Sequence, residues 1–312
     1  MLDIPPMEAT MKGVEMELVD GAYPLLASVW SGSDADAAFT DCDVVVLVGG
    51  FPRKQGMLRK DLIGKNTGIF SAQGKALQRS GKADVKVLVV ANPANTNCAV
   101  LMRNAPKIPR ANFSAMTRLD HNRAASQIAA RAGVLPGAVR DVVIWGNHSA
   151  TQVPDAAHAT VQRGGGGGGG GGAMQTQTVA EAVGADNAGW LGDEFIGTVQ
   201  QRGAAVIKAR GASSAMSAAN GAADHLRDWL GGSGPSELVS MAVCSDGNPY
   251  GALVPDDLIF SFPVVCDGRG GYEIRSGLAL SDATQNLIRK TVQELQEEGV
   301  AAAEAVAQQS KL

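Results

Sequence analysis

The chain has 312 residues, of which 45% are hydrophobic, and its formal net charge is −4. This length suits two domains or one large one, with ample apolar side chains for buried cores. The negative charge argues against a nucleic-acid or anionic-membrane partner, and no apolar run is long enough to span a bilayer. Four cysteines show neither metal-ligand spacing nor a dense disulfide framework. We therefore expect a soluble intracellular protein without a metal site.

The first segment, residues 2–6, resembles the end of a strand in a nucleotide-binding fold. There, an acidic side chain hydrogen-bonds the adenosine ribose of NAD, which makes Asp3 a candidate for cofactor contact. An equally good interpretation of Asp3 is a solvated residue near a frayed terminus. The glycine-rich turn that should precede such a strand is not in the sequence. We therefore expect a domain that is incomplete at its N-terminus.

The next elements alternate between helices and buried strands. Residues 7–18 predict a helix whose spaced apolar residues share one side. Residues 43–50 are an apolar run that ends in glycines, which is typical of a buried parallel strand and a tight turn. A basic loop over residues 51–60 and a helix from about residue 61 to 79 follow. This order favours a parallel sheet with a ligand-facing loop at its edge.

Two more strands continue the pattern. Residues 85–90 are a buried strand by composition, and the run Asn92-Pro93-Ala94-Asn95 follows at its carboxyl end. Taken alone, Asn92 is an ordinary turn asparagine before a proline. Residues 113–116 predict a further short strand.

The chemistry-bearing residues lie on the next two elements. Residues 142–145 predict a strand whose polar, turn-prone end would hold His148 where open α/β sheets bind ligands. Asp120 lies on an earlier helix that ends at Gly133. A carboxylate against the imidazole would fix its tautomer and raise its basicity. Arg123, three residues after Asp120, would project from the same helix face and grip a substrate carboxylate.

These residues carry a family resemblance. Leu119-Asp120-His121-Asn122-Arg123-Ala124 and Trp145-Gly146-Asn147-His148-Ser149 resemble the malate dehydrogenases of the cytosolic type. The likeness runs from Leu2 to about Leu295, interrupted mainly around residues 164–183. It implies an α/β fold with a Rossmann-like parallel-sheet NAD domain over residues 1–117, lacking its first strand and helix. An α+β substrate domain over residues 118–312 would follow.

The resemblance also implies an activity and a set of roles. The activity is reversible hydride transfer between malate and NAD, giving oxaloacetate, in a homodimer, with His148 as the base and Asp120 as its orienting acid. Arg53 would clamp the distal carboxylate, Arg59 would polarise the carbonyl, and Arg123 would hold the near carboxylate. The other matched positions would bind substrate (Asn92, Ser213) or cofactor (Asp3, Asn66, Gln73, Val90, Asn92). Ser213 is equally well explained as the N-cap of the helix that follows it.

The remainder of the chain combines a glycine tract with further strands and helices. Residues 164–172 are nine consecutive glycines, which lack the setting of a phosphate loop, so we expect disorder and no ligand there. Residues 239–243, 258–266 and 272–274 predict antiparallel strands. An apolar stripe then predicts a C-terminal helix that Ser281 caps, and an exposed, flexible tail.

The last three residues, Ser310-Lys311-Leu312, match a receptor-read peroxisomal address. We therefore expect a peroxisomal location, with the cytosol as the alternative.

Two functional alternatives to malate dehydrogenase stay open. One is another 2-hydroxy-acid dehydrogenase, and the other is a truncated, catalytically silent chain that acts only as a dimerisation partner.

Overall fold

A six-stranded sheet forms the centre of the computed structural model, which describes residues 1–51, 59–165 and 172–309. Its order is β1 (Val44–Leu47), β2 (Lys86–Val89), β3 (Phe113–Ala115), β9 (Val239–Cys244), β10 (Ile259–Cys266) and β11 (Tyr272–Ile274). The first three strands run parallel, and β3, β9, β10 and β11 pair antiparallel. The sheet thus begins as a nucleotide-binding unit and ends as a meander, which confirms the predicted fold class.

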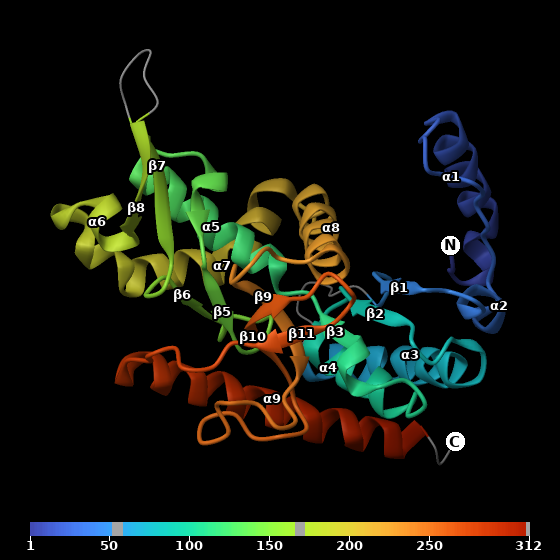
Figure 1. Cartoon of the computed structure of the whole chain (residues 1–312). Helices are drawn as coiled ribbons and strands as arrows, with labels where there is room; N and C mark the ends of the chain where they lie inside the picture. The colour runs from blue at the N-terminus through green and yellow to red at the C-terminus, as the bar shows by residue number, and fades with distance from the viewer. Residues whose placement is uncertain (52–58, 166–171, 310–312) are drawn as a thin grey trace.

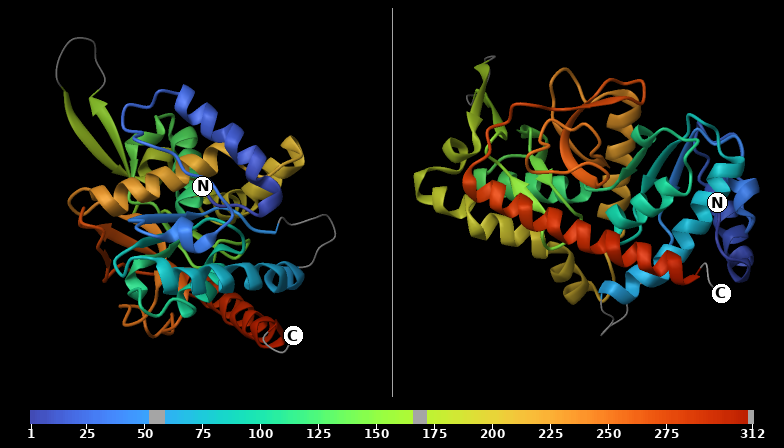
Figure 2. Two further views of the ribbon diagram at one scale, coloured as in Figure 1. Left: turned by 90° about the vertical axis from the view of Figure 1, so that its right-hand side faces the viewer. Right: turned by 90° about the horizontal axis from the view of Figure 1, so that it is seen from below.

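Helices cover both faces of this sheet (Figure 1). One face carries α3 (Arg59–Ser80), α4 (Ala94–Arg103) and α9 (Asp282–Gln309), which pack against one another. The other face carries α5 (Arg118–Ala132) and α8 (Met216–Gly231). In the second view of Figure 2, α9 runs along the molecule from the antiparallel part of the fold toward the first strands. A helix this long can contact both parts of the chain.

The elements between α5 and α8 form two smaller sheets. They are β4 (Val139–Arg140), β7 (Thr160–Gly165) and β8 (Gly172–Thr178) in one, and β5 (Val143–Trp145) and β6 (Val153–Asp155) in the other. The helices here are α6 (Val179–Val183) and α7 (Asp193–Arg210), with 3-10 turns at Pro136–Ala138 and Ala185–Leu191. Successive β5 side chains enter two separate apolar cores, Trp145 one and Ile144 the other. The strand that leads to His148 is therefore fixed from both sides.

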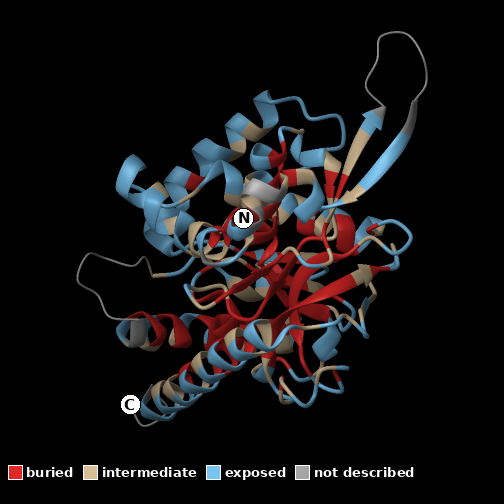
Figure 3. Ribbon diagram, turned by 90° about the vertical axis from the view of Figure 1, so that its left-hand side faces the viewer, coloured by how far each residue is buried: buried red, intermediate tan, exposed pale blue. Residues whose placement is uncertain are grey.

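Exposed helices and loops surround a buried centre (Figure 3), and the first 40 residues are mostly exposed. They form a 3-10 turn (Pro5–Met7), α1 (Glu8–Asp20) and α2 (Ala35–Phe39); another 3-10 turn, Arg110–Asn112, precedes β3. Met11 is the buried residue of α1, whereas Val14 on the predicted apolar side is 38% exposed. The predicted helix is confirmed, but its apolar stripe is covered only in part. The predicted strand end at residues 2–6 is reduced to one isolated bridge, between Leu2 and Gly32, and the 3-10 turn begins at Pro5.

Two strand predictions need correction. The run at residues 43–50 gives β1, but burial alternates along it and Val48 is 65% exposed, because the described residues pair β1 only with β2. β5 does not end at the edge of the parallel sheet, because it pairs antiparallel with β6. A short bridge between Gly146 and Ser261 brings its end beside β10 instead.

Two segments predicted to be flexible have regular structure at their described residues. The hairpin of β7 and β8 extends into the glycine tract, where Gly165 pairs with Gly172; residues 166–171 lie outside the described part of the chain. The expected flexible tail is instead the last part of α9, which continues to Gln309. Ser281 caps this helix as predicted, since its hydroxyl accepts the N–H of Thr284. No helix in the described ranges is both long and apolar enough to cross a membrane.

Candidate active site

Asp120 is a fully buried carboxylate that receives three side-chain donors. Its Oδ2 contacts Nδ1 of His148, and its Oδ1 accepts from Arg123 (3.1 Å) and from Gln152 (3.3 Å). Burial alone would raise the pKa of this carboxyl, but His148, Arg123 and Gln152 together hold the pKa below its ordinary value. Asp120 contacts the imidazole as predicted, and its role in orienting the ring during catalysis stays a prediction.

His148 is held mainly through its backbone. Gly146, which precedes it, has φ +96° and packs so closely on α9 that an added Cβ would lie 2.3 Å from Thr291. The next peptide N–H, that of Asn147, donates to Thr291 Oγ1 (2.9 Å). The His148 N–H donates to Oδ1 of Asn95 on α4 (3.0 Å). With Nδ1 occupied by Asp120, Nε2 is the ring nitrogen left for a substrate.

Arg123 lies on the other side of the same carboxylate. It projects from the helix face of Asp120 as predicted; its Nη1 forms an ion pair with Asp120, and its Nη2 donates to the Ser214 hydroxyl (3.1 Å). The hydroxyl at this point is that of Ser214 and not of Ser213, which is exposed. The N-cap interpretation of Ser213 is wrong, because α8 begins at Met216 with Ala215 as its N-cap. A substrate contact of Ser213 stays a prediction.

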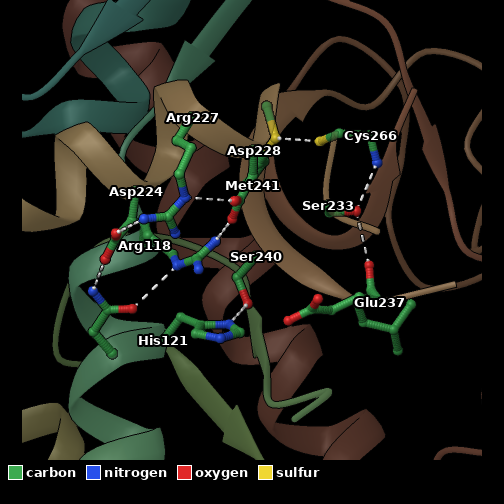
Figure 4. A network of polar contacts seen from close by, with 12 residues as sticks. Arg118, His121, Asp224, Arg227, Asp228, Ser233, Glu237, Ser240, Met241 and Cys266 are labelled. Carbon is green, nitrogen blue, oxygen red and sulfur yellow. Dashed lines mark hydrogen bonds and ion pairs between the residues drawn. The ribbon is translucent and has the colours of Figure 1, made fainter. Parts of the chain in front are cut away.

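A second buried network anchors the remaining faces of α5 (Figure 4). Arg118 forms an ion pair with Asp228 of α8, and both side chains are about nine-tenths buried. His121 Nδ1 hydrogen-bonds the Ser240 hydroxyl (3.1 Å), which also accepts the N–H of Ile144 in β5 (2.9 Å). Burial, with the nearby Arg118 charge, lowers the pKa of His121 to about 3. The strand that leads to His148 and the helix that carries Asp120 are thus tied together.

Of the predicted cofactor residues, Val90 and Asn92 directly follow the carboxyl end of β2. Asn92 is exposed and Val90 half-buried after β2, and Asp3 is exposed with its carboxylate accepting the Ile4 N–H (2.7 Å). Asn66, by contrast, is fully buried. Its amide donates to the carbonyls of Asn92 (2.9 Å) and Phe51 (3.3 Å) and accepts from the N–H of Phe51. Asn66 therefore supports the Asn92 turn, and its direct contact with NAD stays a prediction.

These residues fit a dinucleotide at the place where parallel sheets bind one. Gln73 on α3 keeps a buried Oε1 with no partner among the described residues, so it can accept a hydrogen bond from a ligand. Gly50 allows a close backbone approach, since a Cβ there would meet Asn66 and Ala91 at 3.1 and 3.3 Å. Exposed Val48 offers an apolar surface for a flat ring. Arg53 and the Arg59 side chain lie outside the described residues, so their roles stay predictions.

Besides Ser214, the site contains Gln152, Asn95 and Glu294, which were not predicted. Gln152 donates to Asp120, Asn95 accepts from His148, and Glu294 of α9 accepts from the Asn147 amide (2.9 Å). Asn95 lies in the run Asn92-Pro93-Ala94-Asn95, but its contact with a backbone more than 50 residues away leaves no signal in sequence spacing. Glu294 lies beside an apolar stripe that predicted packing alone.

The parallel strands, together with a buried acid–histidine pair beside an arginine, define an NAD-dependent dehydrogenase. Residues 1–114 match the family model for the lactate/malate dehydrogenase NAD binding domain, and residues 117–306 match the model for the alpha/beta C-terminal domain. The chain belongs to the lactate/malate dehydrogenase family. The predicted family, enzyme class and cofactor are confirmed, whereas the missing first strand and glycine turn and the domain boundary after residue 117 stay predictions.

Relatives and solved structures agree with this assignment. The proteins named "Malate dehydrogenase, cytoplasmic" from Rattus norvegicus and Homo sapiens are each 51% identical over 298 residues, 96% of this chain and 85% of theirs. The crystal structure of malate dehydrogenase from Naegleria fowleri is 43% identical with a TM-score of 0.86, covering 97% of this chain and 87% of that one. Trichomonas vaginalis lactate dehydrogenase in complex with NADH and oxamate is 35% identical with a TM-score of 0.89, covering 98% of this chain and 89% of that one.

The peroxisomal address at residues 310–312 lies outside the described residues and stays a prediction.

Proposed function

We propose that this chain is an NAD-dependent malate dehydrogenase that interconverts malate and oxaloacetate. The observation that carries the proposal is the buried Asp120 carboxylate, which contacts the His148 imidazole at one oxygen and the Arg123 guanidinium at the other. The base His148 and the carboxylate-binding cation Arg123 are thereby held next to each other by one carboxylate. The relatives named malate dehydrogenase, about half identical over nearly the whole chain, support the same reaction.

The proton step belongs to His148. Because Nδ1 faces Asp120, Nε2 accepts the hydroxyl proton as the alcohol is oxidised, and the Asp120 charge stabilises the imidazolium that forms. In the reverse direction the same nitrogen returns the proton to the carbonyl oxygen. When bound, NAD⁺ supplies the acceptor for the hydride that leaves C2 of malate. Asp3, Gln73, Val90 and Asn92 would hold it at the carboxyl ends of the parallel strands.

Substrate choice rests on the arginines. Arg123 keeps N–H groups beyond the two that bind Asp120 and Ser214, and these can bind the carboxylate beside the reacting carbon. A dicarboxylate needs a second cation, and the resemblance gives that role to Arg53, with Arg59 at the carbonyl. Malate is therefore favoured over lactate.

A steady-state assay of NADH absorbance tests the proposal. We expect turnover with malate and with oxaloacetate, and kcat/KM for oxaloacetate at least about 100-fold above that for pyruvate, because pyruvate leaves the second cation unpaired. A preference for pyruvate would instead assign the other 2-hydroxy-acid reaction.

A second candidate is a non-catalytic dimerisation partner. The observation that favours it is the exposed edge of β1, where Val46 and Val48 are uncovered in the described structure. Calorimetry with NAD⁺ separates the two: micromolar affinity supports the enzyme, and no heat of binding supports the silent partner.

We also propose a homodimer, since Met216 of α8 is 87% exposed and Ile207 of α7 is 50% exposed. Sedimentation equilibrium tests this proposal, and a single species of about 32 kDa would refute it.

A further inference from the structure

Asn95 lies where three separate segments of the active site meet. Its side chain is fully buried in the first turn of α4. Its Oδ1 accepts the His148 N–H (3.0 Å), and its Nδ2 donates to the carbonyls of Gly146 (3.3 Å) and Ile259 (2.9 Å). One amide therefore joins α4, the turn that carries His148, and strand β10.

The two contacts with the turn fix both of its ends. Gly146 begins the turn with a left-handed backbone, and it exchanges hydrogen bonds with Ser261 of β10 (3.1 and 2.9 Å). His148 ends the turn and presents the base. Thr291 holds the middle of the turn through the Asn147 N–H, and Asn95 holds the carbonyl of its first residue and the N–H of its last. Among these anchors, Asn95 is the side chain that bonds the His148 N–H itself, so it contributes directly to the direction of the His148 backbone. Asp120 then fixes the ring, not the backbone.

Asn95 also links His148 to Asn92, the predicted contact for both substrate and cofactor. α4 begins directly after Asn92 and Pro93, and the Asn92 carbonyl is held by the buried Asn66 amide. Two buried asparagines thus connect Phe51, Asn92 and His148 through the backbone. The proton acceptor and the predicted cofactor contact are fixed relative to each other without touching.

We propose that Asn95 is a positioning residue that sets the His148 backbone relative to Asn92, so that proton and hydride transfer are aligned. The expected effect on kcat rests on the proposed function. The expected effect on the His148 backbone does not depend on it. A displacement of about 1 Å between reacting groups costs on the order of 100-fold in rate. The loss should fall on kcat, because Asn95 touches neither predicted ligand.

The chain offers a matched control in Asn248, between β9 and β10. It is 9% exposed, its Nδ2 donates to the carbonyls of Ser245 (2.7 Å) and Val254 (2.9 Å), and its Oδ1 accepts the Tyr250 N–H (2.9 Å). The number and kind of hydrogen bonds equal those of Asn95, away from the His148 turn. At either residue, Leu removes all three hydrogen bonds, whereas Asp removes the two that Nδ2 donates and keeps an acceptor oxygen.

The experiment compares Asn95→Leu and Asn95→Asp with Asn248→Leu and Asn248→Asp. Asn95→Leu should lower kcat about 100-fold with little change in KM for NADH, whereas Asn248→Leu should leave kcat within about twofold. Asn95→Asp keeps an acceptor for the His148 N–H but no donor for Gly146, so an intermediate loss is expected. Its new charge would lie near Asp120 and Arg123 of α5 and Glu294 and Glu298 of α9. All kinetics are therefore followed from pH 6 to 9.

Backbone amide exchange measured by NMR separates failure of this inference from failure of the proposed function. The His148 amide should exchange at least about tenfold faster in Asn95→Leu than in the wild type, and it should be unchanged in both Asn248 variants. This readout needs no turnover. If Asn95→Leu does not fold, Asn95→Asp provides the comparison, with its Gly146–His148 turn less protected than in Asn248→Asp. Equal protection in the Asn95 and Asn248 variants, or equal kcat where the wild type is active, would overturn the inference.

Discussion

The two halves of the site differ in how much of their geometry the protein itself supplies. In the proton-transfer half, the oxygens of Asp120 contact His148, Arg123 and Gln152, and all these side chains are at least half-buried. In the cofactor half, Asp3 and Asn92 are exposed and Gln73 keeps an unpaired buried oxygen among the described residues. A buried charge needs partners in every state of the enzyme, whereas a group that binds a cofactor gains its partner on binding. Substitutions should therefore act mainly on kcat in the first half and on KM in the second.

The largest effect is expected at His148. Replacement by Gln removes the proton acceptor while leaving the N–H that Asn95 accepts, so we expect kcat to fall about 1,000-fold with little change in KM for NADH. Steady-state NADH kinetics in both directions provide the measurement. Turnover near that of the wild type would remove His148 from the mechanism.

Asp120→Asn should come next, with a loss of about 100-fold in kcat, because a neutral amide stabilises neither the His148 tautomer nor the imidazolium. Arg123 would also lose its ion-pair partner, so KM for oxaloacetate should change as well. The ¹⁵N shifts of the imidazole report the tautomer directly. An unchanged tautomer in Asp120→Asn would contradict this role.

A smaller effect concerns the stability of the proton-transfer half. Burial, and then the Arg118 charge, lowers the pKa of both His121 and His225 to about 3. The unfolded chain binds these protons below about pH 6.5 and the folded chain does not, so stability falls as pH drops from about 6.5 toward 3. The expected loss is roughly 1.4 kcal/mol per pH unit for each histidine.

His225 offers the cleaner test, because neither ring nitrogen has a hydrogen-bond partner among the described residues. His225→Leu should therefore flatten the pH dependence of the urea midpoint between pH 7.5 and 5.5. His158, whose Nε2 contacts the Ala279 carbonyl near the surface, provides the control variant. An unchanged slope in His225→Leu would show that His225 is not buried in its neutral form.

The same contrast explains what the sequence could predict. The pairing of Asp120 with Arg123 follows from helical spacing, and the approach of His148 followed from the family resemblance. The burial of α1 and β1 could not be predicted. Periodicity shows which side of an element is apolar, but it does not show whether another element packs on that side. Val14 and Val48 lie on apolar sides, and both are exposed. Ser214 in place of Ser213 shows a second limit, since the direction of a side chain in an irregular loop depends on tertiary contacts.

The smallest effect, and the sharpest test of the comparison, is expected at Asp3. Its carboxylate is exposed, and within the described part of the chain it accepts one hydrogen bond, from the N–H of Ile4. Asp3→Asn should therefore leave kcat and thermal stability unchanged and raise KM for NADH by about tenfold or less, the cost of one hydrogen bond to the ribose. Asp20, also exposed, at the end of α1, provides a control for the loss of one surface charge. An effect of Asp3→Asn on kcat would mean that the exposed half also takes part in aligning the reaction. Equal KM values for the two variants would instead leave Asp3 as a solvated residue.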